Sequence, residues 1–136
     1  MIGSNGGPIQ ADSELPIKWL GEEEIKQQMF GKRFRGGFVP GLGHMYWSEC
    51  IDTSGRSVYS SWSTSEQIGQ LTTNSSDQAC FKYAEEENCF RVGRFDEQVY
   101  VFRPLSGRMA EEGIDFWAVQ KDLESPTCRT RQSAND

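Results

Sequence analysis

The stretch that decides the fold covers residues 78–94 and has the sequence QACFKYAEEENCFRVGR. Apolar and polar residues alternate on both sides of an acidic turn, which is the period-two pattern of two antiparallel strands. If Cys80 lies opposite Cys89, Lys82 lies opposite Glu87, and this cross-strand charge pair supports the register. The other face of the predicted hairpin is apolar and points into a core. It carries Phe81, Tyr83 and Phe90.

The rest of the chain repeats the pattern. Runs rich in aromatic and β-branched residues are separated, roughly every 8–12 residues, by turn-forming residues, as in antiparallel sandwiches and barrels. Eight strands suit a small closed barrel, because closure removes exposed edges. We therefore predict a mainly β fold, a small antiparallel eight-stranded barrel. Its strands are expected near residues 32–39, 44–51, 56–62, 66–71, 78–83, 88–94, 98–103 and 114–121.

One short N-terminal segment, residues 21–30, has the features of a helix. Its first turn holds three glutamates, which suit the positive end of the helix dipole. Ile25 and Met29 lie four residues apart on one face, and Gly31 follows as a C-cap. A helix this short needs to dock on the barrel to persist.

The domain organisation is simple. The chain has 136 residues, enough for one core. Residues 1–14 lack the basic and apolar regions of a signal peptide, and we expect them to be a disordered lead-in. A single barrel domain is expected over 15–128, followed by a flexible tail at 129–136.

Composition excludes several classes of function. The net charge of −6 disfavours a nucleic-acid binder, because such proteins are normally basic. No apolar stretch approaches the ~20 residues of a membrane-spanning helix. One histidine rules out a multi-histidine metal site. We expect no cofactor, no metal and no membrane span, and a monomer or homodimer.

The four cysteines predict two disulfides. An even number of cysteines in a small, loop-rich chain indicates an oxidising compartment. Three connectivities are possible, and the hairpin register favours Cys80–Cys89, which leaves Cys50–Cys128. The predicted location is periplasmic or secreted, with the leader already removed.

Two further hairpins are expected. A turn at Asp52–Gly55 pairs Glu49 with Val58 and points both inward, together with Trp47 and Trp62. A turn at Arg94–Glu97 points Val99 and Val101 inward. Both registers leave an aromatic stripe on the outer face, which either binds a partner protein or is covered by the 21–30 helix. Its members are Tyr46, Tyr59, Tyr100 and Phe102.

Four segments resemble a known family. They are residues 20–25 (LGEEEI), 31–36 (GKRFRG), 46–56 and 79–92. Together they are similar to a group of small exported alphaproteobacterial proteins with a lipocalin-like domain of unknown function, over roughly residues 19–103. The resemblance implies a lipocalin-like barrel and export, and it implies no catalytic residues. The chain departs from the family in its Cys50/Cys128 pair and in a longer turn at Ser54-Gly55.

The inward residues are candidate ligand-binding residues. Inward aromatic side chains either fill a barrel of this size or surround one small apolar ligand. A buried carboxylate such as Glu49 must be paired, neutralised or bound to a ligand, and Arg56 and Arg35 are its candidate partners. The candidate ligand-binding set is Trp47, Glu49, Trp62, Phe81, Tyr83 and Phe90.

Two functions follow. The first is a non-enzymatic exported module that binds a small apolar ligand or a partner protein, such as a hydrolase that it inhibits. The second is a cofactor-free pocket enzyme, an isomerase, cyclase or hydrolase, with Glu49 and His44 as acid and base. A cavity that reaches Glu49, with a raised pKa there, favours the enzyme. A filled interior beneath a large exposed apolar patch favours the partner-binding module.

Overall fold

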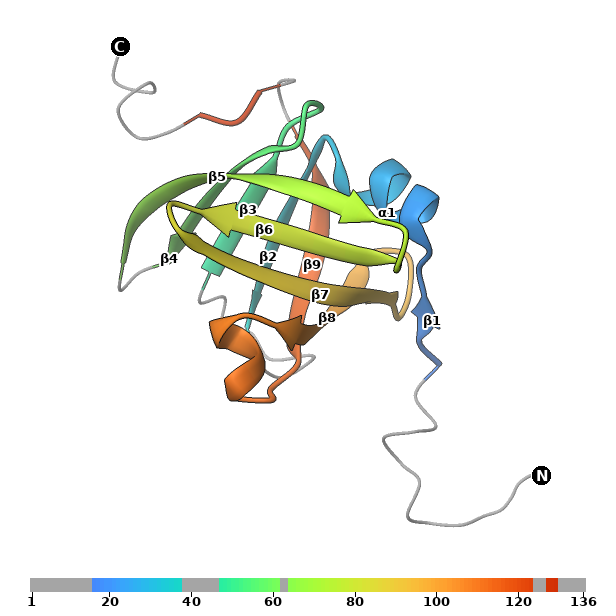
Figure 1. Ribbon diagram of the computed structural model, residues 1–136. Helices are drawn as coiled ribbons and strands as arrows, with labels where there is room; N and C mark the ends of the chain where they lie inside the picture. The colour runs from blue at the N-terminus through green and yellow to red at the C-terminus, as the bar shows by residue number, and fades with distance from the viewer. Residues whose placement is uncertain (1–15, 38–46, 62–63, 124–126, 130–136) are drawn as a thin grey trace, which may run out of the picture.

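The computed structural model describes residues 16–37, 47–61, 64–123 and 127–129 (Figure 1). The predicted lead-in and residues 130–136 of the predicted tail lie outside the described residues. The elements are β1 (Lys18–Trp19), α1 (Glu22–Met29), β2 (Lys32–Gly37), β3 (Trp47–Ile51), β4 (Arg56–Ser61), β5 (Thr64–Asn74), β6 (Gln78–Tyr83), β7 (Glu86–Arg94), β8 (Val99–Ser106), the 3₁₀ helix η2 (Arg108–Glu111) and β9 (Phe116–Asp122).

Strands β2–β9 form a closed antiparallel barrel. Each strand pairs with its neighbour in the order β7-β6-β5-β4-β3-β2-β9-β8, and pairing of β7 with β8 completes the ring. The predicted mainly β, eight-stranded, lipocalin-like barrel is therefore confirmed. The short strand β1 adds to the structure by pairing Trp19 with Gly93 on β7. Among the described residues, no helix has the length and apolar composition of a membrane span.

Helix α1 plugs one end of the barrel, as Figure 1 shows. Ile25 and Met29 are fully buried in the main core cluster, so the predicted apolar face of the helix is confirmed. Asp77, in the β5–β6 turn, accepts a hydrogen bond from the Glu22 backbone N–H at 2.9 Å and so satisfies the helix N-terminus. Gly31 follows the helix with φ of +80°, as a residue that ends a helix often does.

Polar contacts fix the helix over the core. The hydroxyl of Tyr100, which is only 1% exposed, donates to Gln28 Oε1 at 2.9 Å. The Gln120 side chain donates to the Gln28 carbonyl. Leu71 and Val92 are buried with the helix in the same cluster. The interior next to α1 is therefore filled and its polar groups are paired.

The predicted register of the β6–β7 hairpin is confirmed. Cys80 pairs with Cys89 and Lys82 pairs with Glu87. Phe81 and Phe90 are buried and contact each other edge to face, with ring centroids 5.9 Å apart. The aromatic face of this hairpin therefore lies inside the barrel.

The predicted register of the β3–β4 hairpin is wrong by one residue. Ile51 pairs with Ser57 and Glu49 pairs with Tyr59, instead of Val58. The Asp52 carboxylate accepts hydrogen bonds from the Ser54 and Arg56 backbone N–H groups, and Gly55 adopts φ of +93°. The loop is thereby one residue longer than predicted, and a one-residue slip exchanges the two faces of a strand. Tyr59 consequently points inward and Val58 outward.

The predicted register of the β7–β8 hairpin is wrong by three residues. Val92 pairs with Phe102, and Arg94 pairs with Tyr100. Asp96 holds a longer loop by accepting hydrogen bonds from the Gln98 and Val99 backbone N–H groups, each at 3.0 Å. Because the shift is an odd number, the faces of β8 exchange. Tyr100 and Phe102 therefore lie inside the barrel, and the placement of Val99 and Val101 inside it is corrected.

Both predicted disulfides are present. Cys80–Cys89 links neighbouring strands, and Cys50–Cys128 joins β3 to a segment 78 residues further along the chain. Cys50, Cys128 and Val58 are buried in a small second cluster, on the face of β3 and β4 that points away from the barrel interior. The second disulfide therefore fastens residues 127–129 to the outside of the wall.

Candidate functional site

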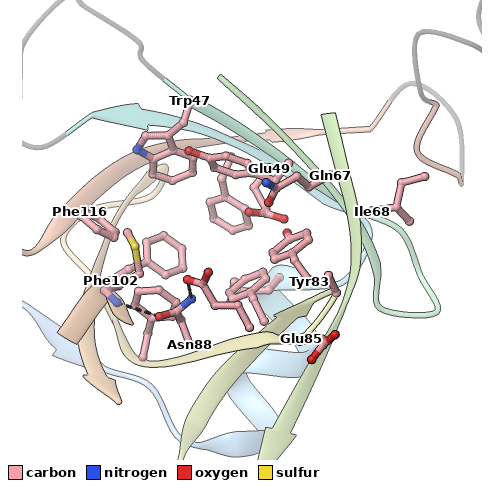
Figure 2. A pocket seen from close by; sticks show the side chains of 17 residues that line it. Trp47, Glu49, Gln67, Ile68, Tyr83, Glu85, Asn88, Phe102 and Phe116 are labelled. Carbon is pink, nitrogen blue, oxygen red and sulfur yellow. Dashed lines mark hydrogen bonds between the residues drawn. The ribbon is translucent and has the colours of Figure 1, made fainter. Parts of the chain in front are cut away.

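The half of the barrel away from α1 contains a cavity of about 830 Å³. Figure 2 shows its side chains converging from the surrounding strands on an open centre. Met29 and Phe34 line the floor near α1, and the exposed residues Ala84 and Glu85 line the mouth. The wall between them is mostly aromatic. It includes Trp47, Tyr59, Phe81, Tyr83, Phe90, Phe102 and Phe116.

Most of the predicted ligand-binding set lines this cavity. Each described member comes from an inward position of β3, β6 or β7, where alternate residues face the interior. Trp62 and the candidate acid/base residue His44 lie outside the described residues. The predicted residues that the structure brings together are Trp47, Glu49, Phe81, Tyr83 and Phe90.

The predicted outer aromatic stripe is corrected. Tyr59 and Phe102 line the cavity, and Tyr100 is buried next to α1. Their change of face follows from the two register shifts, which depend on the loops at Asp52 and Asp96. Tyr46 lies outside the described residues. The three described members of the stripe therefore contribute to the interior and form no outer surface.

Close packing of β2 against β3 positions the Trp47 ring. Gly36 lies opposite Trp47 in the register. A Cβ atom on Gly36 would lie 2.0 Å from the Trp117 carbonyl oxygen and 2.8 Å from Trp47 Cζ2, so only glycine fits there. The Trp47 ring contacts Phe102 edge to face across the cavity, with centroids 6.4 Å apart. The aromatic wall is thus a packed arrangement with fixed ring positions.

Glu49 is the acidic group inside this apolar cavity. It is 8% exposed, and its Oε2 atom has no hydrogen-bond partner among the described residues. Figure 2 shows the carboxyl group pointing into the cavity. Burial raises the pKa of Glu49 well above its ordinary value of 4.5, and a hydrogen bond with Ser57 opposes part of this rise.

The predicted arginine partners of Glu49 are wrong. Arg35 lies beside inward-facing Phe34 on β2 and is exposed. Arg56 donates to the Cys128 carbonyl oxygen at 3.0 Å, on the outside of the barrel. The carboxyl group is therefore buried without a neutralising cation in the described part of the chain, and such a group favours its protonated form.

A short hydrogen-bonded path leads from Glu49 toward the mouth. Ser57, fully buried, bonds to the Glu49 carboxyl and lies 3.0 Å from the Tyr83 hydroxyl. Tyr59 packs near Tyr83, with ring centroids 6.2 Å apart. Burial and the neighbouring Glu49 charge both raise the pKa of Tyr59. The polar groups of this path thus lie on β3, β4 and β6, among aromatic side chains of the same strands.

The buried carboxyl predicts a pH-dependent stability. Between the ordinary pKa of 4.5 and the raised folded pKa, the folded chain binds more protons than the unfolded chain, so stability falls as pH rises through that window. Glu49→Gln removes this pH-dependent contribution to the free energy of unfolding. We expect the variant to gain stability over the wild type from pH 4 toward neutral, by about 1.4 kcal/mol for each pH unit within the window.

Urea unfolding at several pH values measures this difference. Glu85→Gln makes the same chemical change at an exposed position and serves as the matched control. The control is expected to show no such trend. A stability difference between Glu49→Gln and the wild type that stays constant from pH 4 to neutral would contradict the predicted burial of the charge.

The η2 segment is fastened beside the mouth by Asn88. This side chain is 8% exposed; its Oδ1 accepts the Met109 backbone N–H at 2.8 Å and its Nδ2 donates to Glu86 at 3.0 Å. Figure 2 shows these bonds as dashed lines at the lower edge of the cavity. Met109 thereby joins the lining.

Several lining residues were not predicted. Phe34 lies between two exposed arginines, and this alternation is a signal for its inward position. No hairpin register was assigned to the last strand, so nothing indicated the face of Phe116. Ser57, which bonds to Glu49 but is not a lining residue, was placed on the outer face by the register error. Asn88 lies opposite Phe81 in the confirmed β6–β7 register, so alternation does indicate its inward position, although it was not included in the predicted set.

One cluster has metal-ligand chemistry in principle. The ligand atoms of Cys80, Glu87 and Cys89 lie within 4.8 Å of one another on the outside of the barrel. Both sulfur atoms are bonded in the disulfide, so neither is available as the thiolate that binds a metal. The cluster is therefore not a candidate metal site while the disulfide is formed.

Comparison with known proteins identified no relative of this chain. No family model, no curated protein and no solved structure matches the chain. The resemblance to exported alphaproteobacterial proteins therefore stays a prediction.

Proposed function

We propose that the protein is a binding module that holds one small, largely apolar ligand inside its barrel. The observation that carries this proposal is the open cavity of about 830 Å³ with an aromatic wall. Pockets of ~300–1,000 Å³ with mostly apolar linings and a few polar groups are typical of small-molecule sites. A barrel of eight strands has room for side chains or for one small ligand, and here the half away from α1 is hollow.

The alternative of a partner-protein surface, including a hydrolase inhibitor, has less support. Its basis was the outer aromatic stripe, whose described members lie inside. The large hydrophobic residues exposed in the described ranges are Ile68, Leu105 and Ile114. They lie on β5, on β8 and before β9, and single exposed apolar residues are normal on a protein surface.

The two disulfides are consistent with an oxidising compartment. Both cysteine pairs form disulfides, and no cysteine among the described residues is free. Disulfides persist outside the reducing cytosol in most organisms. We propose that the protein works in the periplasm or after secretion.

Binding of a neutral fluorescent probe tests the proposal. N-phenyl-1-naphthylamine is apolar and uncharged, and it is expected to bind with one-to-one stoichiometry. Trp47→Ala is expected to weaken binding about tenfold, because an aromatic contact of this kind contributes ~0.5–1.5 kcal/mol beyond burial of area. Fluorescence titration measures both dissociation constants.

Ile114→Ala is the control for this experiment. Ile114 is 44% exposed, lies just before β9 and is not among the residues that line the cavity. The control is expected to bind the probe within twofold of the wild type. Absence of saturable binding, or equal affinity of the wild type and Trp47→Ala, would contradict an interior site.

A second candidate function, acid–base catalysis by Glu49, has its own support. The cavity reaches Glu49, burial raises its pKa, and Ser57 connects it to Tyr83. These are the features expected of the pocket enzyme. A ligand identified by mass spectrometry of the purified protein can be returned to fresh protein. Recovery of that ligand unchanged supports binding alone, whereas conversion that Glu49→Gln abolishes supports catalysis.

A further inference from the structure

The charge distribution of the cavity is one-sided. Among the described lining residues, the charged types are Glu49 inside and Glu85 and Glu86 at the mouth, with no lysine, arginine or histidine. An ionised carboxylate at Glu49 or Glu85 repels a ligand anion and attracts a ligand cation, whereas Glu86 is already paired with Arg108 at 3.8 Å. Burial favours the protonated form of Glu49 in the free protein, so binding of a cation beside it releases that proton to water, and the bound cation lowers the pKa of Glu49. The net charge of the chain, −6, acts in the same direction.

Glu49 has an acceptor position that the described protein leaves open. Its Oε2 atom makes no hydrogen bond, and the carboxyl group points into the cavity. Leaving a buried polar atom unpaired costs free energy. A ligand N–H placed at this oxygen removes that cost. Glu49 is already removed from water in the free protein. Ligand binding therefore does not add the free-energy cost of desolvating this side chain.

The aromatic wall also favours positive charge. The faces of tryptophan and tyrosine rings carry partial negative charge and attract cations within ~6 Å of the ring centre. Trp47 adjoins Glu49 on the inward face of β3, and Tyr59 lies opposite Glu49 in the register. A cation held by the carboxyl group therefore lies among aromatic rings.

We propose that this cavity selects organic cations, namely amines on an apolar or aromatic body, over neutral and anionic molecules of the same skeleton, with Glu49 as the counter-charge. The inference rests on the proposed function, because it names the ligand class of the same site. It excludes fatty acids and other carboxylates, which have no basic partner among the described lining residues.

Three ligands that share one skeleton test the inference. They are 2-(1-naphthyl)ethylamine, 2-(1-naphthyl)ethanol and 1-naphthylacetate, measured by isothermal titration calorimetry at neutral pH and physiological ionic strength. The amine is expected to bind at least tenfold more tightly than the alcohol. The carboxylate is expected to bind at least tenfold more weakly than the alcohol.

Two glutamate variants assign the selectivity to Glu49. Glu49→Gln is expected to reduce the preference for the amine over the alcohol to less than threefold, while the affinity for the alcohol stays within threefold of the wild type. Glu85→Gln removes a carboxylate from the mouth, and it is expected to retain at least a fivefold preference. The neutral ligand thus reports on the integrity of the cavity in each variant.

The outcomes separate this inference from the proposed function. Equal binding of amine and alcohol by the wild type, or an unchanged preference in Glu49→Gln, overturns the amine assignment and leaves the binding module supported. Binding of N-phenyl-1-naphthylamine without binding of any member of the series does the same. Failure of the series and of that probe together overturns both proposals.

Discussion

Phe34→Ala is expected to lower the free energy of unfolding by about 3–5 kcal/mol, the usual range when a buried phenylalanine is truncated. Phe34 is fully buried. Its ring contacts Tyr100 and Phe102 edge to face, with centroids 5.4 and 5.5 Å away. Both contacts disappear in the variant. Because the cavity already lies on one side of Phe34, few neighbouring atoms are available to move into the space that is left.

Urea or thermal unfolding measures this loss. Ile68→Ala is the control, since a largely exposed side chain contributes little, within about 0.5 kcal/mol. A loss below about 1.5 kcal/mol for Phe34→Ala would contradict the described packing. It would show that this ring does not hold the filled end of the barrel together.

Removal of the Cys50–Cys128 disulfide is expected to cost about 4.5 kcal/mol. In the chain-entropy account, a cross-link stabilises by restricting the unfolded chain, and its effect grows with the length of the closed loop. The two cysteines are 78 residues apart, whereas Cys80 and Cys89 are 9 apart. The double alanine variant of the first pair is therefore expected to lose about 2 kcal/mol more than that of the second.

Chemical unfolding of the two double variants tests this order. Both disulfides have buried cysteines, so the comparison is matched in burial. Because Cys50 faces away from the cavity, probe binding below the unfolding transition is expected to be unchanged without the first disulfide. An equal or smaller loss for the Cys50–Cys128 pair would show that the chain-entropy account fails here.

The architecture was predictable because its signals are local. The β6–β7 register depends on a short turn between two cysteines and on the Lys82–Glu87 pair, and both act across adjacent strands. The registers at Asp52 and Asp96 failed for a physical reason. In each loop an aspartate binds backbone N–H groups and sets the loop length, and strand periodicity carries no information about that length.

The site was predictable only in part. Alternation on β3 placed Trp47 and Glu49 inside the barrel. Whether inward aromatic rings meet or leave a void depends on ring orientation and barrel width, which no pattern of residue types specifies. The absence of a cationic partner for Glu49 among the described residues has a different origin. The predicted partner Arg56 changed face with the β3–β4 register and bonds to the Cys128 carbonyl oxygen instead.

Helix α1 closes one end of the barrel, and this limits the length of ligand that can fit inside. If the proposed site binds a ligand, the described residues leave the end away from α1 as its way in and out, and any part of the ligand that exceeds the depth of the cavity stays in water. Each methylene that fits inside contributes ~0.8 kcal/mol, and each one beyond it contributes almost nothing. Affinity within a homologous series is therefore expected to rise with chain length and then level off, and the carbon number at the plateau would measure the usable depth of the proposed site.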